Sequence, residues 1–381
     1  RDSVASRGLG DVYKRQILGM SVNPEEPYQD LPPLPPAREL QTGQVVNRVI
    51  SASRALATAN ASAKRLPDPS ILIHAIPLLE AKASSEIENI VTTNDELFRA
   101  AHNVEPASPA AREALRYREA LYEGYSYIEK HPFSVNLAKI VCSKIIGFAT
   151  DIRALPGTFI GNPATREHVY TPPQGKETIL EHLSRWEVFA HERESGLDPL
   201  VKMALLHYQF EAIHPFSDGN GRTGRILNVL YLVQSGLLDQ PITYLSGYIV
   251  EHKDEYYRLL NGVTQKGAWG EWIEFILNAV DVTSRWTDSL ITSIYNLLDQ
   301  TISELNQTNL PARDLAFLLF SKPYLRYADL VSGLQVSRPT AAKWASSLSE
   351  MGMIERIKAG KSVILINHRY LDILFTTPLP K

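Results

Sequence analysis

The stretch His214–Arg225, with the sequence His-Pro-Phe-Ser-Asp-Gly-Asn-Gly-Arg-Thr-Gly-Arg, constrains the fold of this chain more than any other feature. Helical patterns cover residues 199–213 before it and residues from about 222 to 234 after it, so the stretch predicts a helix–loop–helix. Gly219 and Gly221 allow a sharp turn that points successive backbone N–H groups inward as an anion nest. The positive end of the second helix's dipole falls at the same place, so the loop predicts an anion site.

The side chains of this loop fit a polyphosphate. Arg222 and Arg225 are three residues apart and are expected to project from one side of the second helix. Asp218 supplies the hard oxygen ligand that Mg²⁺ between two phosphates requires. His214 stands at the mouth of the loop, where a histidine of near-neutral pKa can take a proton from a hydroxyl nucleophile. Phe216 is expected to point inward and anchor the loop in the core.

The loop resembles the signature of Fic-domain proteins, His-Pro-Phe-x-x-Gly-Asn-Gly-Arg-x-x-Arg, at all eight fixed positions. The resemblance extends over residues from about 25 to 375. It implies a protein adenylyltransferase that uses Mg·ATP, with His214 as base, Asp218 as the Mg²⁺ ligand, in-line attack on the α-phosphorus and pyrophosphate as leaving group. It also implies that ATP is held by Gly219, Asn220, Gly221, Arg222 and Arg225.

Three other interpretations stay open at this point. The loop can be a polar helix–helix connection with glycine turn residues. A Fic-type fold can transfer another phosphate-linked group, such as phosphate or phosphocholine, although Asp218 and both arginines favour the triphosphate pose. The chain can also be a DNA-binding regulator whose core only senses ATP, although a sensor needs no base such as His214.

Two further segments match the Fic pattern in position. Short β-like runs within residues 158–171 predict a hairpin flap, which in the family pairs with the target protein as an added strand. The alternative is a plain surface hairpin. Tyr256 and Tyr257 follow the catalytic helix where the family often places a tyrosine pair beside the adenine, and at most one of them is expected to touch the nucleotide. The alternative is that both are core aromatics.

The sequence Ser84-Ser85-Glu86-Ile87-Glu88-Asn89 resembles the inhibitory motif of Fic proteins, Ser/Thr-x-x-x-Glu-Gly/Asn. Ser84, Glu88 and Asn89 occupy its fixed positions, and helical spacing puts Ser84 and Glu88 on one face. A carboxylate paired with Arg225 would take the place of the γ-phosphate and inhibit transfer. The alternative is a solvated glutamate on a helix.

The C-terminal residues differ in charge from the rest of the chain. Residues 313–381 hold ten Lys or Arg and five Asp or Glu, in a chain whose net charge is −3. Helical patterns over residues 315–319, 324–333 and 338–351, followed by a hairpin pattern over residues 353–366, predict a winged helix-turn-helix. Ser337 is expected to cap a recognition-type helix carrying Arg338, Thr340 and Lys343, with Lys358 and Lys361 at the wing. DNA binding and protein contact remain equally open.

The predicted fold is mainly α, a Fic-type helical core with a small hairpin and a C-terminal winged helix. Residues 1–19, which precede Met20 and resemble a sequencing-adapter translation, are expected to be non-native or disordered. The expected domains are 20–115 with the inhibitory helix, 116–285 as catalytic core, 286–312 as linker helix and 313–375 as winged helix. Besides a target protein, the chain itself is a possible substrate of the transfer, and two copies of the chain can form a homodimer.

The remaining sequence features bear on the compartment. The single cysteine, Cys142, lies in an apolar pattern and is interpreted as a buried structural thiol, which fits a reducing cytoplasm. No uninterrupted apolar run approaches the roughly 18 residues of a membrane helix, so a membrane location is not expected.

Overall fold

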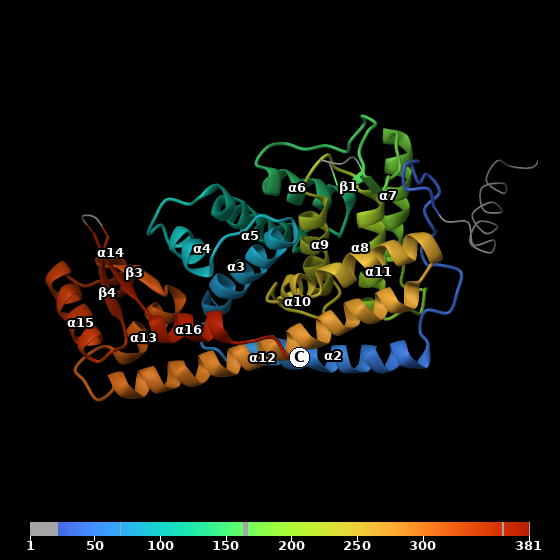
Figure 1. Ribbon diagram of the computed structural model, residues 1–381. Helices are drawn as coiled ribbons and strands as arrows, with labels where there is room; N and C mark the ends of the chain where they lie inside the picture. The colour runs from blue at the N-terminus through green and yellow to red at the C-terminus, as the bar shows by residue number, and fades with distance from the viewer. Residues whose placement is uncertain (1–21, 69, 163–166, 360–361, 381) are drawn as a thin grey trace, which may run out of the picture. The chain divides into compact units, whose positions relative to one another are not determined.

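The computed structural model describes residues 22–380, apart from residues 69, 163–166 and 360–361 (Figure 1). The mainly helical fold class predicted from the sequence is confirmed. The expectation for residues 1–19 concerns residues outside this description. The chain divides into two compact units, each of which is described by itself.

Unit 1 comprises the described residues up to Arg54 together with residues 119–239 and 249–281. The elements that lie wholly within it are α6 (Val135–Ile146), β1 (Ile160–Asn162), β2 (Glu167–Tyr170), α7 (Lys176–His191), α8 (Pro199–Ile213), α9 (Asn220–Gln234) and α11 (Lys253–Lys266). The helices with residues in both units are α2 (Gly43–Ala63), α5 (Pro109–Ile128), α10 (Leu245–Glu251) and α12 (Trp269–Leu305).

Helix α8 forms the core of unit 1. Asp198 caps its N-terminus by accepting a first-turn backbone N–H at 2.8 Å, and Pro199 occupies the first turn, where its missing N–H is tolerated. Apolar side chains surround the helix, so it is buried on almost every side. The indole N–H groups of Trp186 and Trp272 donate to carbonyls of α8 at 3.0 and 2.8 Å. These contacts hold α8 in unit 1, and with it the C-terminal end at which the loop begins.

The proline-rich segment before α2 packs along unit 1. The backbone N–H of Tyr28 donates to Thr171 at the base of the hairpin at 2.9 Å, and Gln209 of α8 donates to the Pro32 carbonyl at 3.2 Å. The hydroxyl of Thr171 donates to the Pro24 carbonyl at 2.6 Å. The proline-rich segment thus connects the hairpin to the core helix α8.

Unit 2 comprises residues 55–118, 240–248 and the described residues from Val282 onward. Its own elements are α3 (Ser70–Ile87), α4 (Asn94–Ala101), α13 (Ala312–Ser321), β3 (Tyr324–Arg326), α14 (Tyr327–Leu334), α15 (Arg338–Glu350), β4 (Glu355–Ala359), β5 (Ser362–Ile366) and α16 (His368–Thr376). The three C-terminal strands form an antiparallel sheet in the order β3-β5-β4.

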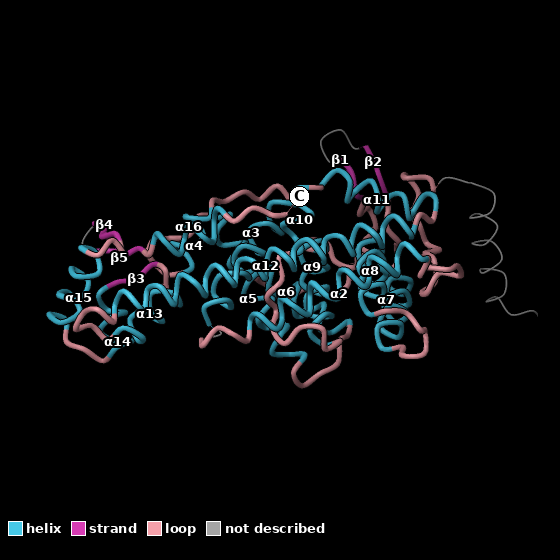
Figure 2. The backbone as a smooth tube through the Cα atoms, turned by 90° about the horizontal axis from the view of Figure 1, so that it is seen from below, coloured by secondary structure: helices cyan, strands magenta, loops and turns pink. Residues whose placement is uncertain are grey.

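The C-terminal module follows the element order of a winged helix, with one difference from the sequence prediction. Residues 324–333 were predicted as one helix, but residues 324–326 form β3 because they pair with β5, and α14 begins only at Tyr327. Figure 2 shows helix over most of the backbone, with strands confined to the hairpin and this module. No helix in the described part of the chain is both long and apolar enough to cross a lipid bilayer.

The packing of α5 makes a testable prediction at Gly124. A Cβ atom there would lie 2.5 Å from Leu230 Cδ1 of α9 and 3.1 Å from Val141 Cγ2 of α6. Gly124→Ala should therefore destabilise the protein, because overpacking costs about 1–3 kcal/mol and exceeds the helix-propensity gain of about 1 kcal/mol. Urea unfolding would measure the change.

The matched control is Gly270→Ala near the start of α12, where no atom lies within 4 Å of the added Cβ. This control keeps the propensity gain without the clash, so its unfolding midpoint should not fall. Equal shifts in the two variants would contradict the close packing of α5.

Candidate active site

The predicted loop begins where α8 ends. His214 caps α8 in the left-handed conformation, with φ 48° and ψ 59°, and its backbone N–H donates to Phe210 O at 3.0 Å. Few non-glycine residues take this conformation, which ends a helix and redirects the chain. The half-buried His214 is therefore held by its own backbone at the first position of the loop.

A buried arginine, Arg153, holds the backbone around His214. Its Nε donates to His214 O at 2.7 Å, and its Nη2 donates to Ile213 O at 3.2 Å and Pro173 O at 2.5 Å. Its backbone N–H donates to Pro215 O at 2.9 Å. Burial lowers the pKa of Arg153, but the negative end of the α8 dipole stabilises its charge. Sequence reasoning missed this residue, because a single arginine before a loop carries no pattern.

Inside the loop, Asn220 and Phe216 form a clip. The Asn220 amide accepts from Phe216 N–H and donates to Phe216 O, both at 2.8 Å. Phe216 is fully buried and lies 6.3 Å from the Phe210 ring, so the prediction that it anchors the loop is confirmed. Since the Asn220 side chain uses both polar atoms within the loop, a ligand would meet its backbone N–H instead.

Gly219 and Cys142 shape the floor of the loop. Gly219 has a positive φ of 80°, and a Cβ there would lie 3.0 Å from Ile146 Cδ1 of α6. Cys142 Sγ, also on α6, donates to Asp218 O at 3.4 Å. Burial raises the pKa of the Cys142 thiol to about 12. The interpretation of Cys142 as a buried structural thiol is confirmed.

Helix α9 starts directly at the clip and carries both predicted arginines. The Thr223 N–H makes the first main-chain bond of the helix, to Gly219 O at 2.9 Å, so residues 220–222 form the N-terminal turn, where the helix dipole favours an anion. Arg222 and Arg225 are 4% and 2% exposed. The turn thus places two guanidinium groups and a positive dipole end within one loop.

The positive charge of Arg225 lies close enough to His207, a buried histidine of α8, to affect its protonation. Burial, with a smaller contribution from the Arg225 charge, lowers the pKa of His207 to about 3. His207 is therefore neutral at physiological pH, and it adds no positive charge beside Arg225. Its Nε2 shares a hydrogen bond with the Tyr256 hydroxyl at 2.9 Å.

The two tyrosines predicted to lie beside the adenine, Tyr256 and Tyr257, differ in their surroundings. Tyr256 is 1% exposed and packs against Trp272 with its ring 5.6 Å away, whereas Tyr257 is 41% exposed. Tyr256 is a core residue that supports His207. Tyr257 is the member of the pair with a ring surface that a ligand can reach.

Asp218 is the exposed carboxylate of the loop. Its side chain is 76% exposed, and its contacts with Gly219 N at 2.6 Å and Arg222 Nη2 at 3.6 Å both use Oδ1. The second oxygen, Oδ2, takes part in neither contact. Among the described residues no group of three or more His, Cys, Asp or Glu could hold a metal, so a cation here would need phosphate oxygens as further ligands.

The flap expected at residues 158–171 is a two-stranded antiparallel hairpin of β1 and β2. A Cβ at Gly161 would lie 2.0 Å from Glu167 O, so the close approach of the strands requires glycine. The Tyr170 hydroxyl donates to Ala212 O in the last turn of α8 at 2.8 Å. The hairpin is therefore tied to α8 two residues before His214.

The predicted inhibitory residues lie in unit 2, at the end of α3. Ser84 is fully buried, Ile87 is the last helical residue, and the exposed Glu88 follows it. Ile90 N–H donates to Ser85 O and Asn89 N–H to Glu86 O, both at 3.0 Å, which forms a Schellman motif. Asn89 takes the left-handed conformation of this motif with φ 62°, which explains why glycine or asparagine suits that position.

A second residue of α3, Glu80, was not singled out from the sequence. It is 1% exposed, and its carboxylate accepts from the Tyr117 hydroxyl at 3.2 Å, the Ser246 hydroxyl at 2.5 Å and the Ser246 N–H at 2.9 Å. Several hydrogen bonds are what a buried carboxylate requires. Glu80 therefore fixes α3 to the start of α10 within unit 2. A glutamate at the end of an apolar run was the only signal for it.

The loop between α8 and α9 combines three features. A histidine whose backbone is fixed at the end of α8 is followed by a short clipped loop and by α9, which carries two buried arginines near its N-terminus. The N-terminus of a helix and two arginines favour an anion, and a histidine side chain can accept a proton.

Comparison with known proteins identifies the family: the chain belongs to the Fic/DOC family. Three family models match, namely "Fic/DOC family N-terminal" over residues 46–126, "Fic/DOC family" over residues 137–232 and "Protein adenylyltransferase SoFic-like, C-terminal domain" over residues 297–370. The second of these covers the whole predicted loop.

The individual relatives have low sequence identity to this chain. "Protein adenylyltransferase fic-1" of Caenorhabditis elegans is 30% identical over 135 residues, which are 35% of this chain and 25% of that protein. "Protein adenylyltransferase Fic" of Drosophila melanogaster is 29% identical over 143 residues, 37% of this chain and 27% of that protein. The chain thus spans about a quarter of the length of these curated relatives. A Fic family protein from Desulfovibrio desulfuricans shares the fold, with TM-score 0.55 and 20% identity over 88% of this chain and 98% of that chain.

The clip predicts a stability effect at Asn220. Asn220→Ala removes both hydrogen bonds and leaves the buried Phe216 N–H and carbonyl without their partners, which should cost about 1–3 kcal/mol of unfolding free energy. The control is Asn136→Ala, an exposed asparagine that makes one side-chain bond to the Tyr127 hydroxyl. Its effect should stay near ±0.5 kcal/mol. Similar unfolding midpoints for the two variants would exclude the clip as a stabilising contact.

Proposed function

We propose that this protein transfers AMP from ATP to hydroxyl side chains of target proteins. The observation that carries the proposal is the loop itself, in which a backbone-fixed His214 precedes a helix N-terminal turn bearing Arg222 and Arg225. A histidine base beside a phosphate cradle suits the transfer of a phosphate-linked group to a hydroxyl. The names of the curated relatives support the choice of AMP as that group.

In the proposed reaction the target hydroxyl attacks the α-phosphorus of ATP. A bond forms between the hydroxyl oxygen and the α-phosphorus, the bond to the bridging oxygen breaks, and pyrophosphate leaves. The His214 imidazole takes the hydroxyl proton, while the α9 turn and its arginines hold the phosphates in line. Arg153 acts as a positioning residue, since it holds the carbonyl of His214 rather than the substrate.

Asp218 Oδ2 and the phosphate oxygens are the ligands proposed for Mg²⁺. Bound there, the cation would neutralise charge on the phosphates during transfer. The ring of Tyr257, rather than that of the buried Tyr256, is proposed to lie against the adenine.

The hairpin is proposed to dock the target. The two strands pair only with each other among the described residues, so each has an outer edge with backbone groups that an extended chain can meet. The tie between Tyr170 and the last turn of α8 would keep such a chain in a constant position relative to α8.

We further propose that Glu88 inhibits the transfer by competing with the γ-phosphate for Arg225. Two observations within unit 2 support this proposal. Glu88 is exposed and lies in the Schellman motif that ends α3, and Glu80 fixes α3 through its hydrogen bonds to Ser246.

Labelling with ATP tests the proposed transfer. Protein should become labelled by α-³²P-ATP and not by γ-³²P-ATP, since AMP retains only the α-phosphate. Label from γ-³²P-ATP would indicate phosphoryl transfer, and ATP binding without label would indicate a sensor. His214→Ala should slow labelling by about 10²–10⁴-fold and leave ATP binding intact. His131→Ala, at an exposed histidine outside the loop, is the control and should label at the parent rate.

The inhibitory role of Glu88 predicts activation by mutation. Glu88→Gly should raise self-labelling by roughly 10–100-fold, because a charge-assisted contact of about 1.5–3 kcal/mol no longer competes with ATP. Adding Arg225→Ala should abolish the gain. Glu86→Gly is the control, since it places the same substitution two residues away and removes a carboxylate already paired with Lys82 at 3.1 Å. A folded, ATP-binding Glu88→Gly protein that labels no faster than the Glu86 control would refute inhibition by Glu88.

A further inference from the structure

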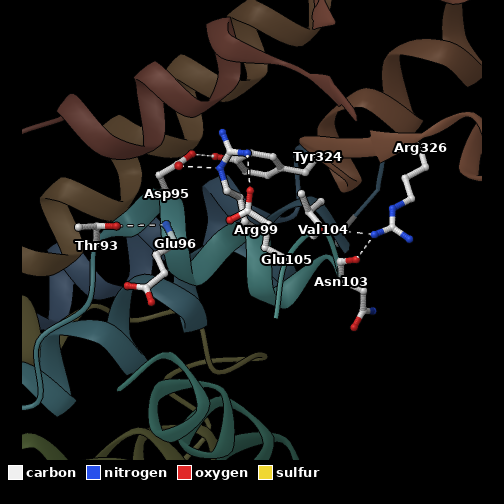
Figure 3. Close-up of polar contacts among 9 residues, drawn as sticks. All are labelled: Thr93, Asp95, Glu96, Arg99, Asn103, Val104, Glu105, Tyr324 and Arg326. Atoms are coloured by element: carbon white, nitrogen blue, oxygen red, sulfur yellow. Dashed lines mark hydrogen bonds and ion pairs between the residues drawn. The ribbon is translucent and has the colours of Figure 1, made fainter. Parts of the chain in front are cut away.

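Within unit 2, the C-terminal module packs against α4 through β3. The Tyr324 hydroxyl of β3 donates to Asp95 Oδ1 of α4 at 2.5 Å, the Arg99 guanidinium lies 5.4 Å from the Tyr324 ring, and Arg326 donates to the Asn103 carbonyl (Figure 3). Figures 1 and 2 agree in placing α15 on the side of the module away from α3 and α4. The face formed by α15 and β4 therefore takes no part in this packing.

That face carries four exposed cations. Arg338 and Lys343 lie on α15, and Arg356 and Lys358 lie on β4. The Arg356 guanidinium donates to the hydroxyls of Ser346 on α15 and Tyr327 on α14, at 3.1 and 3.0 Å. These bonds join the helix and the wing strand into one continuous surface, which we call the α15 face.

None of these four cations forms an ion pair with any described residue. Elsewhere in the C-terminal module, Lys322 pairs with Asp329 at 2.8 Å and Arg369 pairs with Glu304 at 2.9 Å, whereas the exposed Arg313 guanidinium lies 5.7 Å from the Phe317 ring. On α15 and β4, these four cations are accompanied by two exposed carboxylates, Glu350 and Glu355, and Glu355 already contacts His368 of α16. The two elements together therefore carry an excess of positive charge.

The α15 face also lacks the apolar centre of a protein-binding surface. No large hydrophobic side chain of the described C-terminal module is among the exposed ones. Protein interfaces bury an apolar core that is depleted in charge, whereas nucleic-acid interfaces are polar and strongly positive. The width of the major groove of B-form DNA admits a single α-helix, with a wing available to contact the phosphates alongside.

We propose that the α15 face binds duplex DNA, with α15 in the major groove and the cations of α15 and β4 on the phosphates. The binding is predicted to be driven by phosphate contacts and so to depend steeply on salt. The proposal is independent of the transfer reaction, because no residue of the α15 face belongs to the proposed active site.

The test measures fluorescence anisotropy of a labelled duplex of mixed sequence with the full chain, between about 50 and 200 mM salt. Arg338→Ala combined with Lys343→Ala should weaken binding at least about tenfold. The same pair should reduce the slope of log affinity against log salt by about 1.8, since each lost phosphate contact contributes about 0.9. Circular dichroism of each variant confirms that the module remains folded.

The matched control is Lys322→Ala combined with Arg369→Ala, which removes the same net charge from two residues that are already ion-paired. Its affinity and salt slope should stay near those of the parent. An equal loss in both double variants would overturn the proposal, because net charge alone would then explain the binding. So would absence of binding at low salt, or competition by polyglutamate as effective as that by unlabelled duplex. Equal affinity for duplex RNA, whose major groove is too narrow for a helix, would overturn the placement of α15.

Discussion

The buried guanidinium of Arg153 is the contact on which the active-site geometry depends. It bonds to carbonyls of Ile213, His214 and Pro173, so a single rigid group joins the end of α8, the first loop residue and the segment after the hairpin. A lysine would present one flexible ammonium in place of a planar fork and could not match these three directions. Because the last carbonyls of α8 carry partial negative charge, this buried cation is stabilised without a carboxylate.

The rest of the loop is organised in the same manner, by polar groups that hold backbone rather than ligand. Asn220 closes the loop on Phe216, and Cys142 donates to the Asp218 carbonyl beneath it. His207 is neutral and forms a hydrogen bond with the Tyr256 hydroxyl, so it adds no second positive charge beside Arg225. A loop fixed before a ligand arrives loses little conformational entropy on binding, which is the condition for precise alignment of reacting groups.

Much of this site was predictable from the sequence, and the rest was not, for a physical reason. The helices on both sides of the loop and the inward position of Phe216 follow from local patterns of apolar residues and glycines. Arg153 and Glu80 leave no such pattern, because their partners are distant in sequence: 61 residues separate Arg153 from His214, and 166 separate Glu80 from Ser246. Strand β3 was missed for the same reason, since residues 324–326 become extended only by pairing with residues 364–366.

Unit 2 combines the predicted inhibitory residues with the C-terminal module. Helix α3, which ends beside Glu88, packs against α13, and the Tyr370 hydroxyl of α16 donates to the Ile71 carbonyl of α3 at 3.2 Å. Glu80 fixes the middle of the same helix to Ser246. Close-packed elements joined by buried hydrogen bonds move together more readily than they deform. If DNA binds the α15 face as proposed, it binds the same packed unit that carries Glu88. It can then influence Glu88 only by as much as its affinity differs between states of that unit.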